Sequence, residues 1–166
     1  MDINRLSMGE KIVGGASALL VVLSFIPMWA SYEFAGVASE NFGPWSDAYG
    51  FFVKLALIAA ILALVVTGLR AVGTQLPELP LSLGLLYIIL GGLATLGLLI
   101  GVLAGPNDGG VGALAAAAGI DISRGILLFV GLILAVAIAY GGYMHLQSEG
   151  SSSALGDTST PPPPPV

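Results

Sequence analysis

The sequence contains no cysteine, a single histidine and very few charged residues. Without cysteine the chain can form no disulfide, no thiolate metal site and no cysteine nucleophile. A histidine-based metal cluster, or a serine and histidine catalytic pair, would have to depend on His145 alone. The sequence therefore predicts no catalytic residue, no metal site and no cofactor, and we do not expect an enzyme.

Charged residues make up 9% of the chain, whereas they make up about a quarter of an ordinary soluble domain. This scarcity leaves no room for a separate soluble domain. The formal net charge is -5, but the ten acidic residues are spread over loops and both ends of the chain. Neither the sign of the charge nor its distribution favours nucleic-acid binding.

Hydrophobic residues make up 56% of the chain, and most of them lie in four long apolar runs. Each run is close to the roughly 20 residues that a helix needs to cross a bilayer. Lipid offers no hydrogen-bond partner to the backbone, so the runs are expected to be helices. The predicted fold is all-α, a polytopic four-transmembrane-helix bundle within residues 1–146. The predicted helices lie near 12–30, 51–69, 81–104 and 125–143.

Basic residues predict the orientation of the bundle. Arg5, Lys11 and Arg70 fall on the side that holds both termini, whereas Lys54 and Arg124 fall on the opposite side. The positive-inside rule makes the first side cytoplasmic. The first run is longer than the apolar core of a typical signal peptide, so we expect it to be retained as a spanning helix.

Several residues at the ends of the apolar runs are predicted to anchor the bundle at the membrane interface. Aromatic rings favour the headgroup level, and a lysine near a helix end can extend its charge to water. A loop carboxylate such as Asp47 could instead pair with Lys54, and a ligand or ion role is the alternative. The fourth helix is expected to stop near His145. The predicted anchors are Trp29, Trp45, Lys54, Tyr143 and His145.

Small residues at four-residue spacing predict the contacts between helices. In lipid such rows allow two backbones to approach closely. We expect packing within the chain, with a contact between separate chains as the alternative. The predicted packing residues are Gly97, Gly101 and Gly105 in the third run and Gly131, Ala135 and Ala139 in the fourth.

The remaining predictions concern the end of the first helix and the two connections on the external side. Pro27 predicts a kink near the end of the first helix. The 31–50 loop is long and contains several aromatic residues, so it is a candidate for partner contact, with simple capping of the bundle as the alternative. Asp121 or Ser123 is expected to cap the fourth helix.

The last 20 residues, 147–166, are rich in Ser, Thr and Pro and end with five consecutive prolines before Val166. This segment has no apolar periodicity and is predicted to be a disordered cytoplasmic tail. A docking or phosphorylation site is the alternative interpretation.

Several segments of the chain carry a family resemblance. They are the opening RLSMGEKIVGG, the FIPMW that ends the first run, the loop segment PWSDAYGFF, and the GIDISRGILL and YGGYM that flank the last run. In these segments the chain resembles a group of small actinobacterial four-span integral membrane proteins of unknown function. The resemblance covers most of residues 1–146 and implies a multi-pass protein of the bacterial plasma membrane.

These observations favour a structural or interaction component, either an accessory subunit or a scaffold, over a protein with its own chemistry. The expected partners are the lipid bilayer and either other membrane proteins or further copies of the chain. The alternative is a small oligomeric pore or transporter assembled through the Gly97, Gly101 and Gly105 face, with Lys54 at its entrance.

Overall fold

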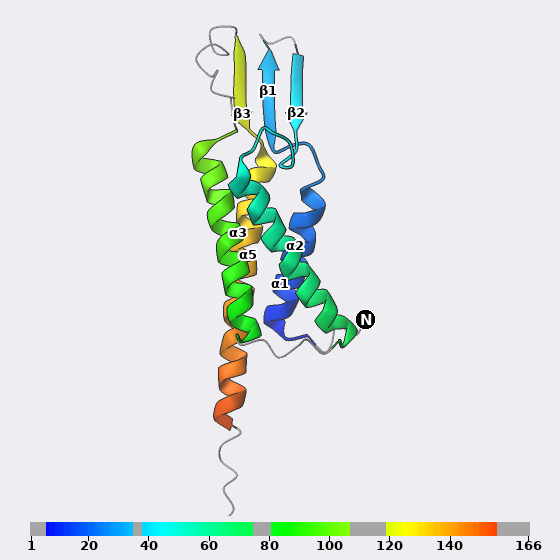
Figure 1. The fold of residues 1–166 in the computed structure, drawn as a ribbon, viewed down its shortest axis with the longest axis vertical. Helices are drawn as coiled ribbons and strands as arrows, with labels where there is room; N and C mark the ends of the chain where they lie inside the picture. Colours follow the sequence, from blue (N-terminus) through cyan, green and yellow to red (C-terminus); the bar gives the residue numbers. More distant parts are fainter. Residues whose placement is uncertain (1–5, 35–37, 75–80, 107–118, 156–166) are drawn as a thin grey trace, which may run out of the picture.

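The computed structural model describes residues 6–34, 38–74, 81–106 and 119–155. Within these residues a bundle of helices carries a small antiparallel sheet at one end (Figure 1). The start of α1 and the end of α5 lie at the other end of the bundle. The helices are α1 (Met8–Leu23), α2 (Phe51–Val72), α3 (Leu83–Ala104) and α5 (Ile126–Leu155), and the strands are β1 (Ala30–Phe34), β2 (Ala38–Phe42) and β3 (Ile120–Arg124).

Three of the described helices are long and apolar enough to cross a membrane, namely α2, α3 and residues Ile126–Gly150 of α5. Large apolar side chains remain exposed along them, among them Ile58, Leu62, Leu96, Ile133 and Val136. Lipid is the solvent in which such a surface is stable. The predicted helical bundle and its membrane location are therefore confirmed at this level. The helix α1 has 16 residues and is shorter than the other three.

The first helix differs from its predicted range of 12–30. It begins four residues earlier, at Met8, and ends at Leu23, so Pro27 lies beyond the helix and does not kink it. The backbone N–H of Ile26 and the indole Nε1 of Trp29 both donate to the carbonyl of Leu23, at 3.1 and 2.9 Å. These bonds satisfy the end of the helix where the chain turns toward the sheet.

The last helix also differs from its prediction. It does not stop near His145 but continues to Leu155, and in Figure 1 it projects below the rest of the bundle. The prediction that disorder begins at 147 is thus wrong for residues 147–155. The proline run lies outside the described residues.

The closest helix contact joins α3 to α5, which run side by side over most of the bundle (Figure 1). A Cβ atom added at Gly91 would lie 2.3 Å from the backbone nitrogen of Ala139, and one at Gly84 would lie 2.6 Å from the Cα of Leu146. From the other helix, a Cβ at Gly142 would lie 2.7 Å from the Cβ of Tyr87. Only glycine fits at these positions, because carbon atoms normally stay 3.5 to 4.0 Å apart.

The predicted packing residues of the third run have two different roles. Gly97 and Gly101 lie against α2, where added Cβ atoms would meet the carbonyl of Phe52 at 2.4 Å and the side chain of Val53 at 2.5 Å. Gly105 instead ends α3 with a φ of 76°, which a glycine adopts without strain.

In the fourth run, Gly131 faces the indole of Trp29, with an added Cβ only 2.9 Å from the ring. Ala135 is fully buried, and Ala139 packs closely against Gly91 of α3. All three predicted residues of this helix therefore lie at contacts within the chain.

The sheet is the main element that the sequence analysis did not predict. Its strand order is β2-β1-β3, with β1 antiparallel to both neighbours. The 31–50 segment thus contains two paired strands rather than an irregular loop, and the rings of Tyr32 and Phe42 meet edge to face at 4.8 Å. Ser123 does not cap the last helix, since it lies in β3 and its hydroxyl is hydrogen-bonded to that of Ser31 at 2.8 Å.

The sheet is fixed to the helices through the backbone of Trp29. Its N–H donates to Phe42 at 3.1 Å, and its carbonyl accepts the N–H of Gly125 at 2.7 Å and the hydroxyl of Tyr49. Burial raises the pKa of Tyr49 to about 12, with nearby Tyr32 adding to the shift and Arg124 opposing it. The junction therefore joins the segment between α1 and α2 to the start of α5, about 90 residues further along the chain.

Candidate functional site: a buried ionisable cluster

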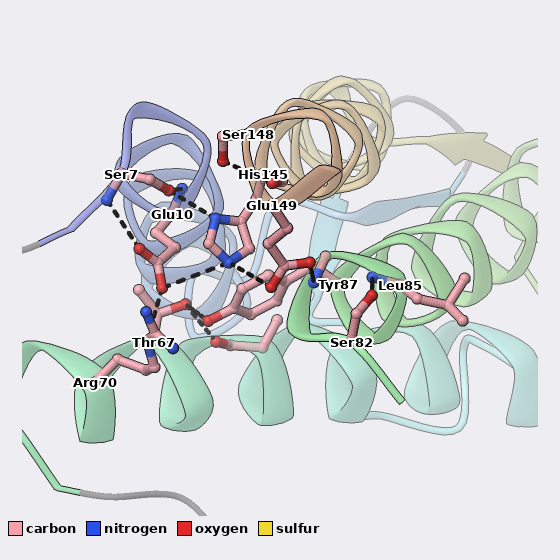
Figure 2. Close-up of polar contacts among 12 residues, drawn as sticks. Ser7, Glu10, Thr67, Arg70, Ser82, Leu85, Tyr87, His145, Ser148 and Glu149 are labelled. Atoms are coloured by element: carbon pink, nitrogen blue, oxygen red, sulfur yellow. Dashed lines mark hydrogen bonds and ion pairs between the residues drawn. The ribbon is translucent and has the colours of Figure 1, made fainter. Parts of the chain in front are cut away.

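The candidate site lies at the end of the bundle opposite the sheet, where side chains from all four described helices converge (Figure 2). It begins with the first turn of α1, a reciprocal capping box. The amide of Glu10 donates to the hydroxyl oxygen of Ser7 at 3.2 Å, and the amide of Ser7 donates to Glu10 Oε2 at 2.8 Å. This motif explains why the helix begins before the apolar run, since it satisfies two backbone donors that would otherwise lack partners.

The Glu10 carboxylate is held inside the protein rather than at its surface, with 1% of its side chain exposed. Its Oε1 lies 2.8 Å from Nε of Arg70, in the last turn of α2. A buried carboxylate is stable only when it is paired, so this ion pair fastens the start of α1 to the end of α2. The guanidinium remains about one third exposed.

His145 occupies the centre of the cluster (Figure 2). Its Nδ1 lies 2.8 Å from the Ser7 hydroxyl. Its Nε2 points between two carboxylates, 3.4 Å from Glu149 Oε1 and 3.9 Å from Glu10 Oε1. The ring is buried inside the bundle, and its role as an interface anchor stays a prediction. The first turn of α1 lies over the histidine and separates it from the surface.

Tyr87 and Thr67 form the inner boundary of the cluster. The Tyr87 ring is fully buried and meets the His145 ring edge to face, with centroids 6.0 Å apart. The Tyr87 and Thr67 hydroxyls are hydrogen-bonded at 3.1 Å, and Thr67 also donates to the carbonyl of Ala63 at 2.8 Å. This pair of hydroxyls links α3 to α2 beside the charged groups.

Glycines allow the helices to close around these side chains. A Cβ at Gly9 would lie 2.5 Å from the carbonyl oxygen of Gly141 and 2.7 Å from the backbone nitrogen of His145. The close approach of α1 to α5 therefore places Ser7 and Glu10 directly on the imidazole. At the start of α3, the amide of Gly84 donates to Glu149 Oε2 at 3.4 Å.

The cluster contains a serine, a histidine and a glutamate in contact, the three residue types of a hydrolytic triad. The geometry favours a structural use of the serine. Its oxygen is already the acceptor that caps α1, and it is also hydrogen-bonded to Nδ1 of His145. A nucleophile needs an accessible oxygen beside donors for an oxyanion. Among the described residues, no group of three His, Asp or Glu side chains is arranged to hold a metal ion.

Two carboxylates and one guanidinium converge on an imidazole that can be neutral or charged. The contacts of His145 with Glu10 and Glu149 are ion pairs only when the ring is protonated.

The predicted interface anchors other than His145 lie outside this cluster. Trp29 is fully buried, and its indole joins the end of α1 to α5. Trp45 is 40% exposed, and its Nε1 donates to the Ser24 hydroxyl at 3.2 Å. Tyr143 is half exposed and accepts a bond from Gln147 at 2.8 Å.

Lys54 pairs with Asp47, one of the two structural roles that the sequence left open, with Nζ 3.7 Å from the carboxylate oxygen. The Asp47 side chain is fully exposed. Exposed ion pairs of this kind contribute little to stability. The pair therefore neutralises a lysine near the start of α2 and does not form a ligand site.

The sequence analysis missed Ser7, Glu10, Arg70 and Glu149 as members of one site. The Ser-x-x-Glu spacing of Ser7 and Glu10 is a recognisable capping box, and it would have placed Glu10 inside a helix. The four-residue spacing of His145 and Glu149 would have placed both on one helical face. No signal in the sequence shows that the two pairs meet.

The chain matches no protein-family model, no curated protein and no solved structure.

Proposed function

We propose that this protein is a structural or interaction component of a bacterial plasma membrane, an accessory subunit or scaffold that binds another membrane protein through its three-stranded sheet. The observation that supports this proposal is the presence of the sheet. Helices in a bundle need connections of only about 2 to 8 residues. Here two connections about 90 residues apart in sequence are instead joined into one sheet and fixed to the helices through Trp29.

One face of the sheet supports this role. Alternation along the paired strands places only polar side chains on it, namely Ser31, Glu33, Ser39, Asn41, Asp121 and Ser123. Glu33 stands directly opposite Asp121, and like charges in that position weaken strand pairing. The polar face is therefore better suited to contact with water or a partner than to stabilising the fold.

The outer edge of β2 offers a second way to bind a partner. Within the described part of the chain, β2 pairs only with β1. Its other edge presents unpaired backbone donors and acceptors, to which an extended segment of another protein can add as a strand.

We further propose that α1 crosses the membrane together with the turn that follows it, which makes four crossings with both termini cytoplasmic. Gly9 lies against Gly141, and Trp29 lies against Gly125 and Gly131. Sixteen residues separate Gly125 from Gly141, about 24 Å of helix. The segment from Gly9 to Trp29 therefore covers the same depth as this part of α5, and the sheet would lie outside the cell.

Photocrosslinking in native membranes tests the proposed interface. A photoreactive amino acid is placed at Ser39 or Asn41 on β2, both of which are exposed. The matched control carries it at Ile133, an exposed apolar residue of α5. We expect one reproducible protein adduct at the sheet positions and only lipid adducts at the control. Adducts that are the same at all three positions, or absent from the sheet, would refute the proposal.

The orientation is tested separately with single cysteines, because the chain has none of its own. A membrane-impermeant maleimide added to intact cells should label Asn41→Cys, and it should label Lys11→Cys only after the cells are broken. Labelling of both positions in intact cells would contradict the four-span proposal.

A small oligomeric pore is less well supported. Its proposed contact face contained Gly97 and Gly101, but both positions are filled by α2 of the same chain. A second copy could not use these glycines for close packing unless α2 first moved away.

A further inference from the structure

We propose that the outer edge of β2 binds an extended, antiparallel segment of a partner protein that carries a lysine or an arginine opposite Glu40. The segment has polar residues on either side of the basic one and an apolar residue opposite Phe42. This inference rests on the proposed function, because it names the chemistry of the partner that the sheet binds. It can fail while that function stands, since a partner of other chemistry would still occupy the sheet.

The backbone of β2 determines how a further strand pairs with it. Within the described residues β2 lies at the edge of the sheet (Figure 1). The carbonyl of Phe42 points toward β1, because it accepts the N–H of Trp29 at 3.1 Å. Backbone groups alternate in direction along a strand, so those of Ser39 and Asn41 point outward. An added antiparallel strand would bond to these two residues. Glu40 would then occupy a non-hydrogen-bonded pair, where opposing side chains come closest.

The charge of the sheet favours a basic segment. The three strands contain the acidic residues Glu33, Glu40 and Asp121 and one basic residue, Arg124. The Arg124 guanidinium donates to the carbonyl of Leu103, near the end of α3, at 3.3 Å. Glu40 is exposed, and no ion pair among the described residues involves it. A lysine or an arginine opposite Glu40 would complete an ion pair, whereas an acidic residue there would be repelled.

The two faces of the sheet determine which residues flank the basic one. Alternation places Glu40 and Phe42 on the same face as Tyr32, whose ring meets that of Phe42 edge to face at 4.8 Å. Ser39 and Asn41 lie on the opposite, polar face. An added strand continues both faces. It therefore needs an apolar residue opposite Phe42 and polar residues opposite Ser39 and Asn41.

A second copy of the chain fits this edge poorly. The strands run along the same direction as α3 and α5 (Figure 1), so two copies in one membrane would share the direction of β2. Their edges would pair only as parallel strands, related by a two-fold axis along the membrane normal. That axis turns the sheet over and joins the polar face of one copy to the face that carries Phe42 in the other. The edge therefore disfavours self-pairing and selects a different protein.

The test uses the full chain in lipid nanodiscs, with a photoreactive amino acid at the exposed position Asn41 as the reporter. The probes are synthetic peptides of the form Thr-Val-Thr-X-Thr-Val-Thr, in which X is lysine, glutamine or glutamate. This pattern alternates as the edge requires. A fourth peptide has lysine at X and N-methyl groups on the two threonines beside it. It keeps the charge but lacks the backbone donors that face β2.

We expect the concentration for half-maximal capture to be about 2- to 30-fold lower for the lysine peptide than for the glutamate peptide, with glutamine between them. This range corresponds to one favourable cross-strand charge pair replaced by one unfavourable pair. The N-methylated peptide should not be captured above background, because its charge alone cannot pair with the strand. Equal capture of the lysine and glutamate peptides, or capture of the N-methylated peptide, would overturn the proposal.

Two matched variants locate the contact. Glu40→Lys should reverse the order of the peptides, so that the glutamate peptide is captured best, and a misfolded protein would not show this gain. Glu33→Lys makes the same change of net charge on β1, away from the edge, and should keep the preference for the lysine peptide. The same reversal in both variants would show that only net charge matters, and it would overturn the proposal.

The same variants in native membranes separate this inference from the proposed function. The protein adduct at Asn41 should be lost in Glu40→Lys and retained in Glu33→Lys. An adduct that persists unchanged in Glu40→Lys would overturn the basic segment and leave the sheet as the binding surface. An adduct with a second copy of the chain would overturn it as well. The absence of any adduct in the wild type would refute both proposals.

Discussion

The contact between α3 and α5 allows a sharp prediction, because two adjacent glycines of α3 have opposite surroundings. A Cβ at Gly91 would lie 2.3 Å from the backbone nitrogen of Ala139 and 2.5 Å from its Cα, whereas a Cβ at Gly92 would meet nothing within 4 Å. We therefore expect Gly91→Ala to destabilise the bundle and Gly92→Ala to leave it unchanged or make it more stable.

The magnitude follows from the geometry. Carbon atoms normally stay about 3.5 to 4.0 Å apart, so the two backbones must separate by about 1 Å or more. Overpacking of this kind costs about 1 to 3 kcal/mol. At the open site, replacing glycine by alanine in a helix contributes up to about 1 kcal/mol. The gain in helix propensity is common to both variants and cancels, so the two should differ by the overpacking cost of about 1 to 3 kcal/mol, or roughly 5- to 140-fold in the folded to unfolded ratio.

The assay is reversible unfolding in mixed micelles, in which the fraction of a denaturing detergent is raised while circular dichroism follows helix content. Gly92→Ala controls for the change in helix propensity, since it alters the same helix one residue away. Equal stability of the two variants would refute the reasoning, because it would mean that the backbones of α3 and α5 are not in contact at this point.

Three further predictions concern the buried cluster, the junction at Trp29 and the ion pair of Lys54. Glu10→Ala should destabilise the bundle by about 1 to 3 kcal/mol, less than for a fully buried pair because Arg70 is partly exposed. In a double-mutant cycle, the variant that carries both Glu10→Ala and Arg70→Ala should be destabilised by less than the sum of the two single variants, and strict additivity would contradict the pairing. The Tyr49 pKa is raised from 10.0 to about 12, so the stability that its hydroxyl contributes is complete below pH 10 and is lost as the pH rises through about 12. In a tyrosinate absorbance titration, the late-titrating amplitude should be smaller in Tyr49→Phe than in the wild type, and no difference between the two proteins would count against the junction. Lys54→Met should leave the unfolding midpoint unchanged, because the partner carboxylate is fully exposed, and a clear loss of stability would show that the lysine has another role.

Much of the helical part of the fold could be predicted from the sequence, because lipid imposes length and apolarity on each spanning segment. The predicted ranges of the second and third helices agree with α2 and α3 to within about three residues at each end. The two terminal helices were predicted less well. The polar first turn of α1 packs against α5 at Gly141 and His145, whereas α5 continues past this contact to Leu155.

The sheet could not be predicted in the same way. Each strand has five residues, and β1 pairs with a strand about 90 residues further along the chain. Short strands carry weak local signals, and a distant partner leaves no periodicity to detect. Trp29 was assigned to the membrane interface for a similar reason, because its hydropathy does not reveal that Gly131 leaves space for its ring.

The sequence by itself determined the apolar, membrane-like character of this protein and the helical character of its long runs, because hydropathy and local spacing act on neighbouring residues. Only the tertiary structure decided that two external connections form one sheet and that Glu10, Arg70, His145 and Glu149 form one charged cluster. The physical reason is that a buried charge is stable only beside its partner, and those partners lie on three helices whose approach depends on glycine contacts between distant segments.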